Sequence, residues 1–226
     1  MTEARKPPAF LFDLDGTLVD SVYQHVVAWR EALKRSGIDL SVWRIHRRIG
    51  MSGGLLVQAL LSETGVDLRP EEVEVLQSRH AELYAEQLHS IDALPGASEL
   101  LAHLTEAGVP WIIATSGRSR GAQPMLAKLG LAEGTPMVTR DEVRWAKPDP
   151  DLFLAAAERI GVDPANAMVV GDSSWDILAA RRAGALGVGL QSGGYGRDEL
   201  ERAGAFRVYE DPAGMLRHLH ELGVRT

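Results

Sequence analysis

The sequence has no cysteine, no long apolar run and no excess of positive charge. The lack of cysteine excludes disulfides, thiolate metal sites and cysteine nucleophiles. Lysine and arginine (24) against aspartate and glutamate (31) give a net charge of −7, so we expect no nucleic-acid partner. No segment has the ~18 uninterrupted apolar residues of a membrane span, and residues 1–10 have no signal-peptide core. We therefore expect a cytoplasmic protein with no membrane partner.

Short apolar runs alternate with helix-like stretches through much of the 226 residues. The apolar runs that predict buried strands occupy 9–14, 111–117, 136–142 and 167–174. The helix-like stretches occupy 98–108, 124–130, 151–161 and 175–184, with glycines where helices are expected to end. This βαβ alternation predicts an α/β fold, a Rossmann-like parallel sheet with helices on both faces. The ligand site is then expected at the carboxyl ends of the strands.

Residues 22–90 break this alternation. They show helical periodicity at 23–37, 53–65 and 70–88 and contain no comparable buried strand. We predict an inserted all-helical cap domain, residues 22–90, and a catalytic core domain formed by residues 1–21 and 91–226. The two connections between them are candidate hinges for a cap that closes over the site and excludes water.

The strongest chemical signal is the segment Asp13-Leu14-Asp15-Gly16-Thr17. Alternate residues at a strand end can present two carboxylates to one site, and Gly16 permits a tight exit from the strand. Such a pair repels itself, and Mg²⁺, which prefers hard oxygen ligands, is the natural partner. The same spacing also fits two carboxylates that only cap a turn.

Polar groups follow the other predicted strands as well. Thr115 and Ser116 end the second strand, Lys147 precedes a proline in a loop, and 171–176 (GDSSWD) ends another strand with two more carboxylates. Each feature alone is typical of a turn, a helix cap or a solvated surface. Their common placement at one end of the sheet favours a single site, with a nucleophile, a proton carrier, a metal cage and phosphate-binding donors.

With four ordered motifs, the sequence resembles the haloacid dehalogenase superfamily, in its phosphatase branch with a helical cap, similar to phosphoglycolate phosphatases and β-phosphoglucomutases. The motifs are DLDGT at 13–17, IIAT at 112–115, Lys147 in AKPDP, and GDSSWD at 171–176. The resemblance implies Mg²⁺-dependent hydrolysis of a small phosphomonoester, such as a phosphosugar or phosphoglycolate, through an aspartyl-phosphate. The implied partner is a small phosphorylated metabolite; no oligomeric state is indicated.

The resemblance also assigns roles to residues. Asp13 is the expected nucleophile and Asp15 the general acid and base. Thr115 and Lys147 are expected to bind the transferring phosphoryl group, with Ser116 and Gly117 beside them in the substrate site. The expected Mg²⁺ site comprises Asp13, Asp15 through its backbone carbonyl, Asp172 and Asp176, although Asp176 alternatively orients Lys147.

The cap segment 20–32 is similar to the start of the β-phosphoglucomutase cap, in Asp20, His25, Ala28, Trp29 and Arg30. This raises a phosphosugar mutase as the alternative function. A phospho-ligand-binding protein without catalysis is the remaining one. We expect His25 to contact Asp15 or the hinge and to belong to the substrate site; the alternative is a histidine that only packs at the interface.

Two cap positions favour the phosphatase over the mutase. Gly53 stands where the mutase branch carries an arginine, and His80 where it carries a substrate-binding lysine. A mutase must hold a bisphosphate intermediate, which requires cations on the distal phosphate. We expect the loop 50–54, with Gly53, to face the site and tune its specificity. Arg118 and Arg120 are either solvated or in contact with an anionic substrate, and 193–196 is interpreted as a loop at the rim of the site.

Overall fold

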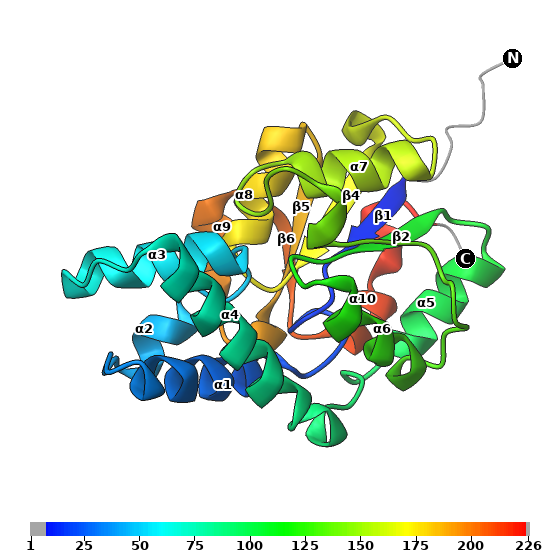
Figure 1. The fold of residues 1–226 in the computed structure, drawn as a ribbon. Helices are drawn as coiled ribbons and strands as arrows, with labels where there is room; N and C mark the ends of the chain where they lie inside the picture. Colours follow the sequence, from blue (N-terminus) through cyan, green and yellow to red (C-terminus); the bar gives the residue numbers. More distant parts are fainter. Residues whose placement is uncertain (1–7, 225–226) are drawn as a thin grey trace, which may run out of the picture.

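The computed structural model describes residues 8–224, which are built around one six-stranded parallel sheet of order β3-β2-β1-β4-β5-β6 (Figure 1). The strands are β1 (Ala9–Phe12), β2 (Trp111–Ala114), β3 (Met137–Val138), β4 (Ala167–Gly171), β5 (Leu186–Leu190) and β6 (Ala205–Tyr209). All neighbouring strands run parallel. The predicted α/β fold class is confirmed.

Two strands of this sheet, β5 and β6, were not among the sequence predictions. Strand β5 reads LGVGL, whose glycines interrupt the apolar run, and its first residue is exposed. Strand β6 lies at the sheet edge with Phe206 and Arg207 exposed. Neither segment shows the unbroken apolar run of a central parallel strand, which is why the pattern alone missed them.

Helices cover both faces of the sheet, because successive strand residues point to opposite sides. Phe10 and Phe12 of β1 pack in one apolar cluster, and Ala9 and Leu11 in another. The first cluster includes residues of α5 (Ala97–Glu106), α6 (Ser119–Lys128) and α10 (Pro212–Arg217); the second includes α7 (Asp151–Arg159) and α8 (Ser174–Ala183). Helix α9 (Arg197–Ala203) packs beside β6. Short 3-10 helices lie at Leu88–Ser90, Arg140–Glu142, Pro164–Asn166, Gln191–Gly193 and Leu219–Leu222.

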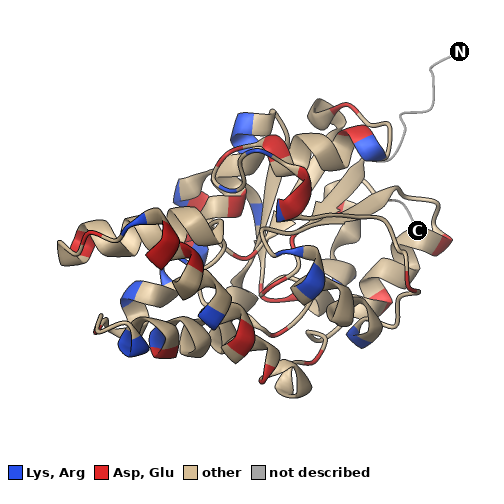
Figure 2. Ribbon diagram, in the orientation of Figure 1, with Lys and Arg blue, Asp and Glu red and all other residues tan. Residues whose placement is uncertain are grey.

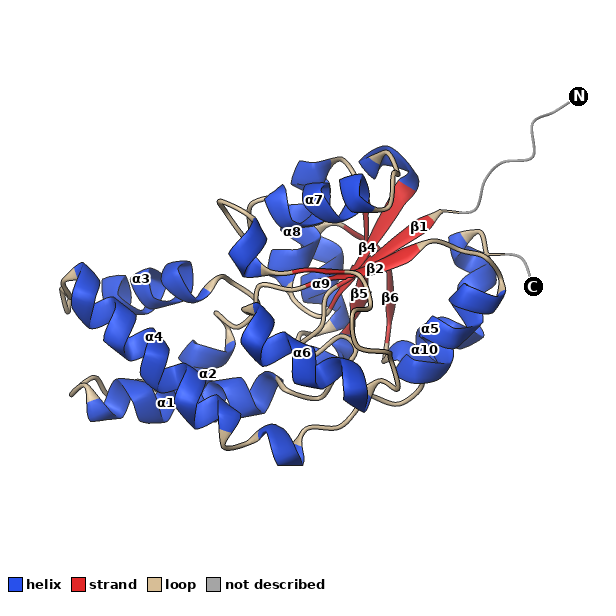
Figure 3. Ribbon diagram, turned by 45° about the vertical axis from the view of Figure 1, so that its right-hand side comes forward, coloured by secondary structure: helices blue, strands red, loops and turns tan. Residues whose placement is uncertain are grey.

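Four further helices lie beyond the carboxyl end of the sheet (Figure 3): α1 (Val22–Arg35), α2 (Val42–His46), α3 (Gly53–Thr64) and α4 (Pro70–Ala85). They share an apolar cluster of their own, in which Trp29, Ile45, Leu60 and Leu76 are buried. Helix α2 was not predicted, since five residues are too few to display a helical period. The proposed division into a cap of residues 22–90 and a core of residues 1–21 and 91–226 stays a prediction.

Acidic and basic residues are interspersed along the helices in the view of Figure 2. No helix within residues 8–224 has the length and apolar character needed to cross a membrane. The strand β1 lies between β2 and β4, where the direction of strand succession reverses, and ligands of open α/β sheets bind outside such points. Asp13 directly follows β1 there, and its N–H donates to the Val170 carbonyl at 2.8 Å.

Candidate active site

Five polar residues that the sequence singled out lie buried at the carboxyl end of the sheet: Asp13, Thr115, Lys147, Asp172 and Asp176. They come from four separate stretches of the chain, and strands β1, β2 and β4 end next to three of these stretches. Buried charged groups are costly unless they are paired or hydrogen-bonded. The hydrogen-bond and ion-pair partners of these side chains therefore indicate which ligands the cluster can bind.

Lys147 is fully buried between two carboxylates. Its Nζ lies 2.6 Å from Asp13 Oδ1 and 2.8 Å from Asp176 Oδ1. Burial alone would lower the pKa of Lys147, but Asp13 and then Asp176 outweigh burial and raise it above its ordinary value. The ammonium is therefore charged and fixed in position, with a third N–H left for another acceptor.

Asp176 is held from both sides. While Oδ1 accepts from Lys147, Oδ2 accepts from the backbone N–H of Ser173 at 3.1 Å and from its hydroxyl at 2.5 Å. A Cβ on Gly171 would lie only 2.3 Å from Asp176 Cβ, so a glycine is required for this approach. Both carboxylate oxygens of Asp176 are therefore engaged, one by Lys147 and the other by Ser173.

Carboxylate oxygens of Asp13, Asp172 and Asp176 all lie within 4.8 Å of one another, and two of these side chains, Asp13 and Asp176, contact the ammonium of Lys147. Burial, together with the neighbouring carboxylates, raises the pKa of Asp13 to about 7 even though Lys147 opposes it, and raises the pKa of Asp172 well above its ordinary value. When all three carboxylates are ionised, the one positive charge of Lys147 leaves the cluster with a net negative charge. A divalent cation with a preference for oxygen ligands fits this donor set.

Asp172 is enclosed by small residues. The hydroxyl of Thr17 donates to Asp172 Oδ1 at 3.3 Å. A Cβ on Gly193 would lie 1.6 Å from Asp172 Oδ2, and one on Gly16 would lie 2.6 Å from it. The sequence indicates a rim loop at 193–196, whereas the structure places Gly193 directly against this carboxylate.

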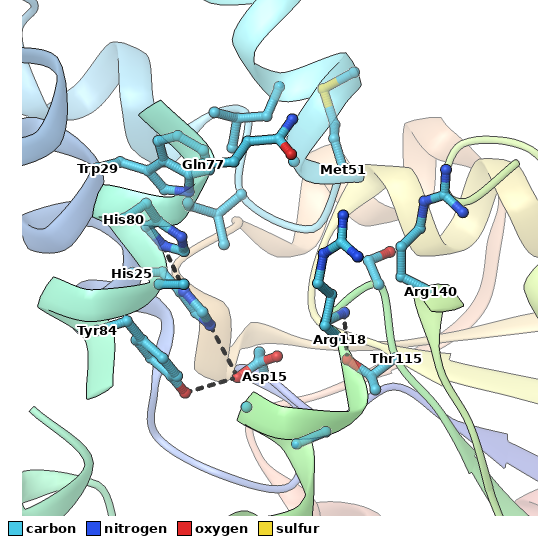
Figure 4. Close-up of a pocket in the computed structure, with 18 of the residues that line it drawn as sticks. Asp15, His25, Trp29, Met51, Gln77, His80, Tyr84, Thr115, Arg118 and Arg140 are labelled. Atoms are coloured by element: carbon cyan, nitrogen blue, oxygen red, sulfur yellow. Dashed lines mark hydrogen bonds and ion pairs between the residues drawn. The ribbon is translucent and has the colours of Figure 1, made fainter. Parts of the chain in front are cut away.

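Asp15 faces the helices beyond the sheet (Figure 4). Its Oδ1 accepts from the hydroxyl of Ser21 at 2.5 Å and from that of Tyr84 at 3.4 Å, and lies 3.3 Å from His25 Nε2. Burial would raise the pKa of Asp15, but His25 and then Ser21 lower it to about 2. His25 thus contacts Asp15, which is one of the two contacts expected for it. Ser21 and Tyr84 were missed, because a single hydroxyl outside any motif gives no signal in the sequence.

Comparison with known proteins identifies the family. Residues 7–184 match the family described as hydrolase, haloacid dehalogenase-like hydrolase. The chain belongs to this haloacid dehalogenase-like hydrolase family. It is 36% identical over 177 residues to hexitol phosphatase A of Escherichia coli (strain K12), covering 77% of this chain and 79% of that protein. It is 32% identical over 217 residues to the phosphoglycolate phosphatase of Rhodospirillum rubrum, covering 92% and 89% of the two proteins.

A crystal structure of a hydrolase from Pseudomonas syringae superposes on this hydrolase with a TM-score of 0.93 and 55% identity, covering 95% of this chain and 98% of that one. Together with the curated relatives, this similarity shows that the resemblance found in the motifs extends over the whole fold. The protein is a phosphatase of the haloacid dehalogenase-like family.

The hydrolase has a cavity of about 980 Å³ between the sheet end and the helices α1, α3 and α4. Asp13, Asp15, Lys147 and the segment Thr115–Gly117 lie at its sheet side. Thr115 Oγ1 accepts from the Gly117 N–H at 2.9 Å, and the Ser116 hydroxyl donates to the Gly50 carbonyl at 3.2 Å. The predicted loop 50–54 therefore touches the segment Thr115–Gly117, and Gly53 lines the cavity at the start of α3.

The opposite walls of the cavity differ in character. Figure 4 shows Trp29, His25 and His80 on one side and Arg118 and Arg140 across from them. Trp29 is almost fully buried in the apolar cluster of the helices and also lines the cavity. Arg118 lines it too, but its side chain is 72% exposed and pairs with Asp141 at 3.0 Å.

A second set of contacts joins the loop after α2 to the region around Asp172. Trp175 Nε1 donates to the Arg47 carbonyl at 3.3 Å, and the Tyr195 hydroxyl donates to the same carbonyl at 3.0 Å. His46 Nε2 lies 2.8 Å from the Gly193 carbonyl. The end of α2 and the residue after it are therefore hydrogen-bonded to the segments that flank Asp172.

Proposed function

We propose that this phosphatase hydrolyses small phosphorylated metabolites by transferring the phosphoryl group first to Asp13 and then to water. The observation that carries the proposal is that Asp13, Asp15 and Lys147 line one cavity, with the Lys147 ammonium 2.6 Å from Asp13 Oδ1. A nucleophile and a separate proton carrier at one cavity are what a two-step transfer requires.

In the first step, an oxygen of the Asp13 carboxylate attacks phosphorus, and the phosphorus–oxygen bond of the ester breaks. The electron pair leaves with the alkoxide, which takes a proton from the protonated form of Asp15 and departs as an alcohol. The negative charge of a bound phosphate favours this protonated form, in opposition to His25 and Ser21, which lower the pKa of Asp15. In the second step, Asp15 accepts a proton from a water molecule whose oxygen attacks the aspartyl-phosphate. Inorganic phosphate leaves and the Asp13 carboxylate is regenerated.

The charge on the transferring group is stabilised by donors aimed at its oxygens. Lys147 supplies an ammonium fixed by two carboxylates, and Thr115 supplies a buried hydroxyl at the end of β2. The backbone amides that follow Asp13 and Thr115 supply further donors. Loss of one such donor typically costs ~3 kcal/mol of barrier, or roughly a hundredfold in rate.

Asp13, the backbone carbonyl of Asp15, and Asp172 would hold a Mg²⁺ ion in this proposal. Its role is to neutralise charge where an anionic phosphoryl group meets an anionic nucleophile. The raised pKa values of Asp13 and Asp172, caused by burial and by neighbouring carboxylates, support a cation at this cluster. Asp176, whose two oxygens contact Lys147 and Ser173, is assigned to orienting Lys147.

The proposed substrates are phosphosugars, sugar-alcohol phosphates and phosphoglycolate. The names of the curated relatives support this class, since they include a hexitol phosphatase, a phosphoglycolate phosphatase and a fructose-1-phosphate phosphatase. The cavity of about 980 Å³ has room for a sugar phosphate, and Gln77, Ser78 and His80 offer polar groups on its wall.

The experiment that tests the function is a panel of these phosphate esters, with kcat/KM measured from released inorganic phosphate. We expect Mg²⁺-dependent release from at least one member, loss of release with EDTA, and no release by a folded Asp13→Asn variant. The proposal would be contradicted by a folded wild-type protein that releases phosphate from no ester, or by an Asp13→Asn variant that keeps wild-type turnover.

A further inference from the structure

Helix α4 forms one long wall of the cavity. At one end of this wall, the Tyr84 hydroxyl donates to Asp15 at 3.4 Å, and Ala81, Ser78 and Gln77 line the cavity farther along the helix. Figure 4 shows Tyr84 beside Asp15 and Gln77 at the far end of the wall. An α-helix rises about 1.5 Å per residue, so Gln77 lies about 10 Å along α4 from Tyr84. The cavity therefore extends along α4, away from Asp15.

The amide of Gln77 is available to a ligand at this far end. Its side chain is partly buried and extends from α4 toward Met51 (Figure 4). No hydrogen bond joins this amide to the other residues drawn in Figure 4. A Cβ on Gly54 would lie 3.7 Å from Gln77 Nε2, so the glycine leaves space beside the amide. An amide both donates and accepts, as a hydroxyl does, and Gln77 therefore suits a hydroxyl group.

The surroundings of Gln77 disfavour a second anion. Glu74, three residues before Gln77 on the same helix, also lines the cavity and brings a carboxylate. The guanidinium groups of Arg118 and Arg140 across the cavity already have partners, Asp141 for the first and two backbone carbonyls for the second. A neutral hydroxyl can pair with the amide of Gln77, whereas a terminal carboxylate there would be repelled by Glu74.

The length of an ester decides whether it reaches Gln77. A fully extended chain advances about 1.2 Å per bond. From phosphorus to the terminal oxygen, a six-carbon polyol phosphate therefore spans about 10 Å, glycerol 3-phosphate about 6 Å and phosphoglycolate about 5 Å. We propose, on the basis of the phosphatase function proposed above, that Gln77 determines specificity by binding the distal hydroxyl of a six-carbon neutral sugar or sugar-alcohol phosphate.

A series of polyol phosphates of increasing length tests this proposal. The full-length protein with Mg²⁺ is given the monophosphates of glycerol, erythritol, ribitol and glucitol, and kcat/KM is measured from released phosphate. We expect kcat/KM of wild type to rise at least about tenfold from the three-carbon to the six-carbon ester, which is the effect of roughly one added hydrogen bond.

Replacement of Gln77 by methionine removes the amide and keeps the length of the side chain. We expect Gln77→Met to lower kcat/KM for glucitol 6-phosphate about tenfold and for glycerol 3-phosphate less than about twofold, because the shorter ester does not reach this position. The matched control is Gln58→Met on α3, because Gln58 is exposed and is not among the described residues that line the cavity. The control should leave the whole series unchanged, and circular dichroism establishes that both variants are folded.

A second pair of esters tests the preference for a neutral end. Glucitol 6-phosphate and 6-phosphogluconate have the same number of carbon atoms, but the second ends in a carboxylate. We expect wild type to hydrolyse 6-phosphogluconate with a kcat/KM at least about tenfold lower. A preference for 6-phosphogluconate would contradict the proposal and would indicate that a cation lining the cavity, such as Arg120, binds the distal group.

Two further results would overturn the proposal. One is a kcat/KM of wild type that does not rise with the length of the ester. The other is an equal loss on short and long esters in Gln77→Met, which would make Gln77 a packing residue. Failure of the proposed function is distinguishable from both, because it would appear as absent phosphate release from every ester, whereas these results require a wild-type protein that is active.

Discussion

The ammonium of Lys147 lies 2.6 Å from Asp13 Oδ1, and both side chains are buried at the end of the sheet. In this ion pair Lys147 opposes the effect of burial, which raises the pKa of Asp13, and the ammonium keeps one N–H for a further acceptor. Asp176 holds Lys147 from the other side at 2.8 Å. The ammonium of Lys147 thus lies between two carboxylates, where its positive charge reduces their repulsion toward an anionic phosphoryl group.

Replacement of Asp15 by asparagine should separate proton transfer from the rest of the reaction. The amide cannot donate a proton to the leaving group, so we expect a loss of about 10²–10⁴-fold in kcat for an alkyl phosphate and a smaller loss for an aryl phosphate, which needs less protonation. Steady-state kinetics on both esters measure the ratio. Asp39→Asn, at an exposed position, is the matched control. Equal losses on the two esters would remove Asp15 from the role of leaving-group acid.

Stability of the metal-free protein should depend on the pH through Asp13. Its pKa is raised from 3.8 to about 7, chiefly by burial, so the folded state binds this proton more tightly than the unfolded state. The resulting stabilisation is present at low pH and is lost as the pH rises from about 4 to 7. We expect the Tm of the EDTA-treated protein to fall over this range, and the fall to be smaller in Asp13→Asn.

Mg²⁺ should act in the opposite direction to the proton, because both bind the same carboxylates. Thermal denaturation is therefore measured with and without Mg²⁺ at about pH 5 and about pH 7.5. We expect the larger increase in Tm at the higher pH, where Asp13 is ionised. An equal increase at both pH values would show that the ion binds elsewhere.

Replacement of Gly193 by alanine tests the proposed role of Asp172, because the contact between these two residues is known only from the three-dimensional structure. A Cβ at this position would lie 1.6 Å from Asp172 Oδ2, so Gly193→Ala must displace the carboxylate proposed to hold Mg²⁺. We expect kcat/KM to fall at least about tenfold and the Mg²⁺ requirement to rise. Gly196→Ala is the matched control in the same loop, because its Cβ would meet Glu199 at an ordinary 3.5 Å. A Gly193→Ala enzyme with wild-type Mg²⁺ dependence would contradict the assignment of Asp172.

The chain should release phosphate rather than isomerise sugar phosphates. Gly53 brings no side chain to the cavity, and the neutral His80 brings no cation, so neither grips a second phosphate. With glucose 1-phosphate and catalytic glucose 1,6-bisphosphate, we expect inorganic phosphate or no reaction, and little glucose 6-phosphate. Isomerisation faster than phosphate release would show that a basic group such as Arg118 supplies the missing contact.

The sequence predicted those parts of the protein that are encoded locally. The strands that end next to Asp13, Thr115 and Asp172 are buried on both faces and read as short apolar runs followed by polar residues, so both the fold class and the candidate residues could be inferred. Strands β5 and β6 were not predicted, because glycines interrupt the apolar run of β5 and exposed residues occupy β6.

Contacts between distant segments could not be predicted in this way. Tyr84 reaches Asp15 across 69 residues of sequence, and Gly193 meets Asp172 from a different loop. These approaches depend on how α4 and the 3-10 turn after β5 pack against the sheet end. A tyrosine on a helix and a glycine in a loop occur in many structural contexts. Their contacts with a distant residue therefore cannot be predicted from the sequence pattern alone.

Chemical trapping of the phosphoryl group on Asp13 tests the central claim most directly. Wild type and Asp15→Asn, in which the water step is slowed, are quenched during turnover of an aryl phosphate and treated with borohydride, which reduces an acyl phosphate to an alcohol. We predict that peptide mass spectrometry finds homoserine in place of aspartate at position 13, more of it in Asp15→Asn than in wild type, and none without substrate. Turnover with no modification at Asp13 in either protein, or with the modification on another carboxylate, would contradict the account.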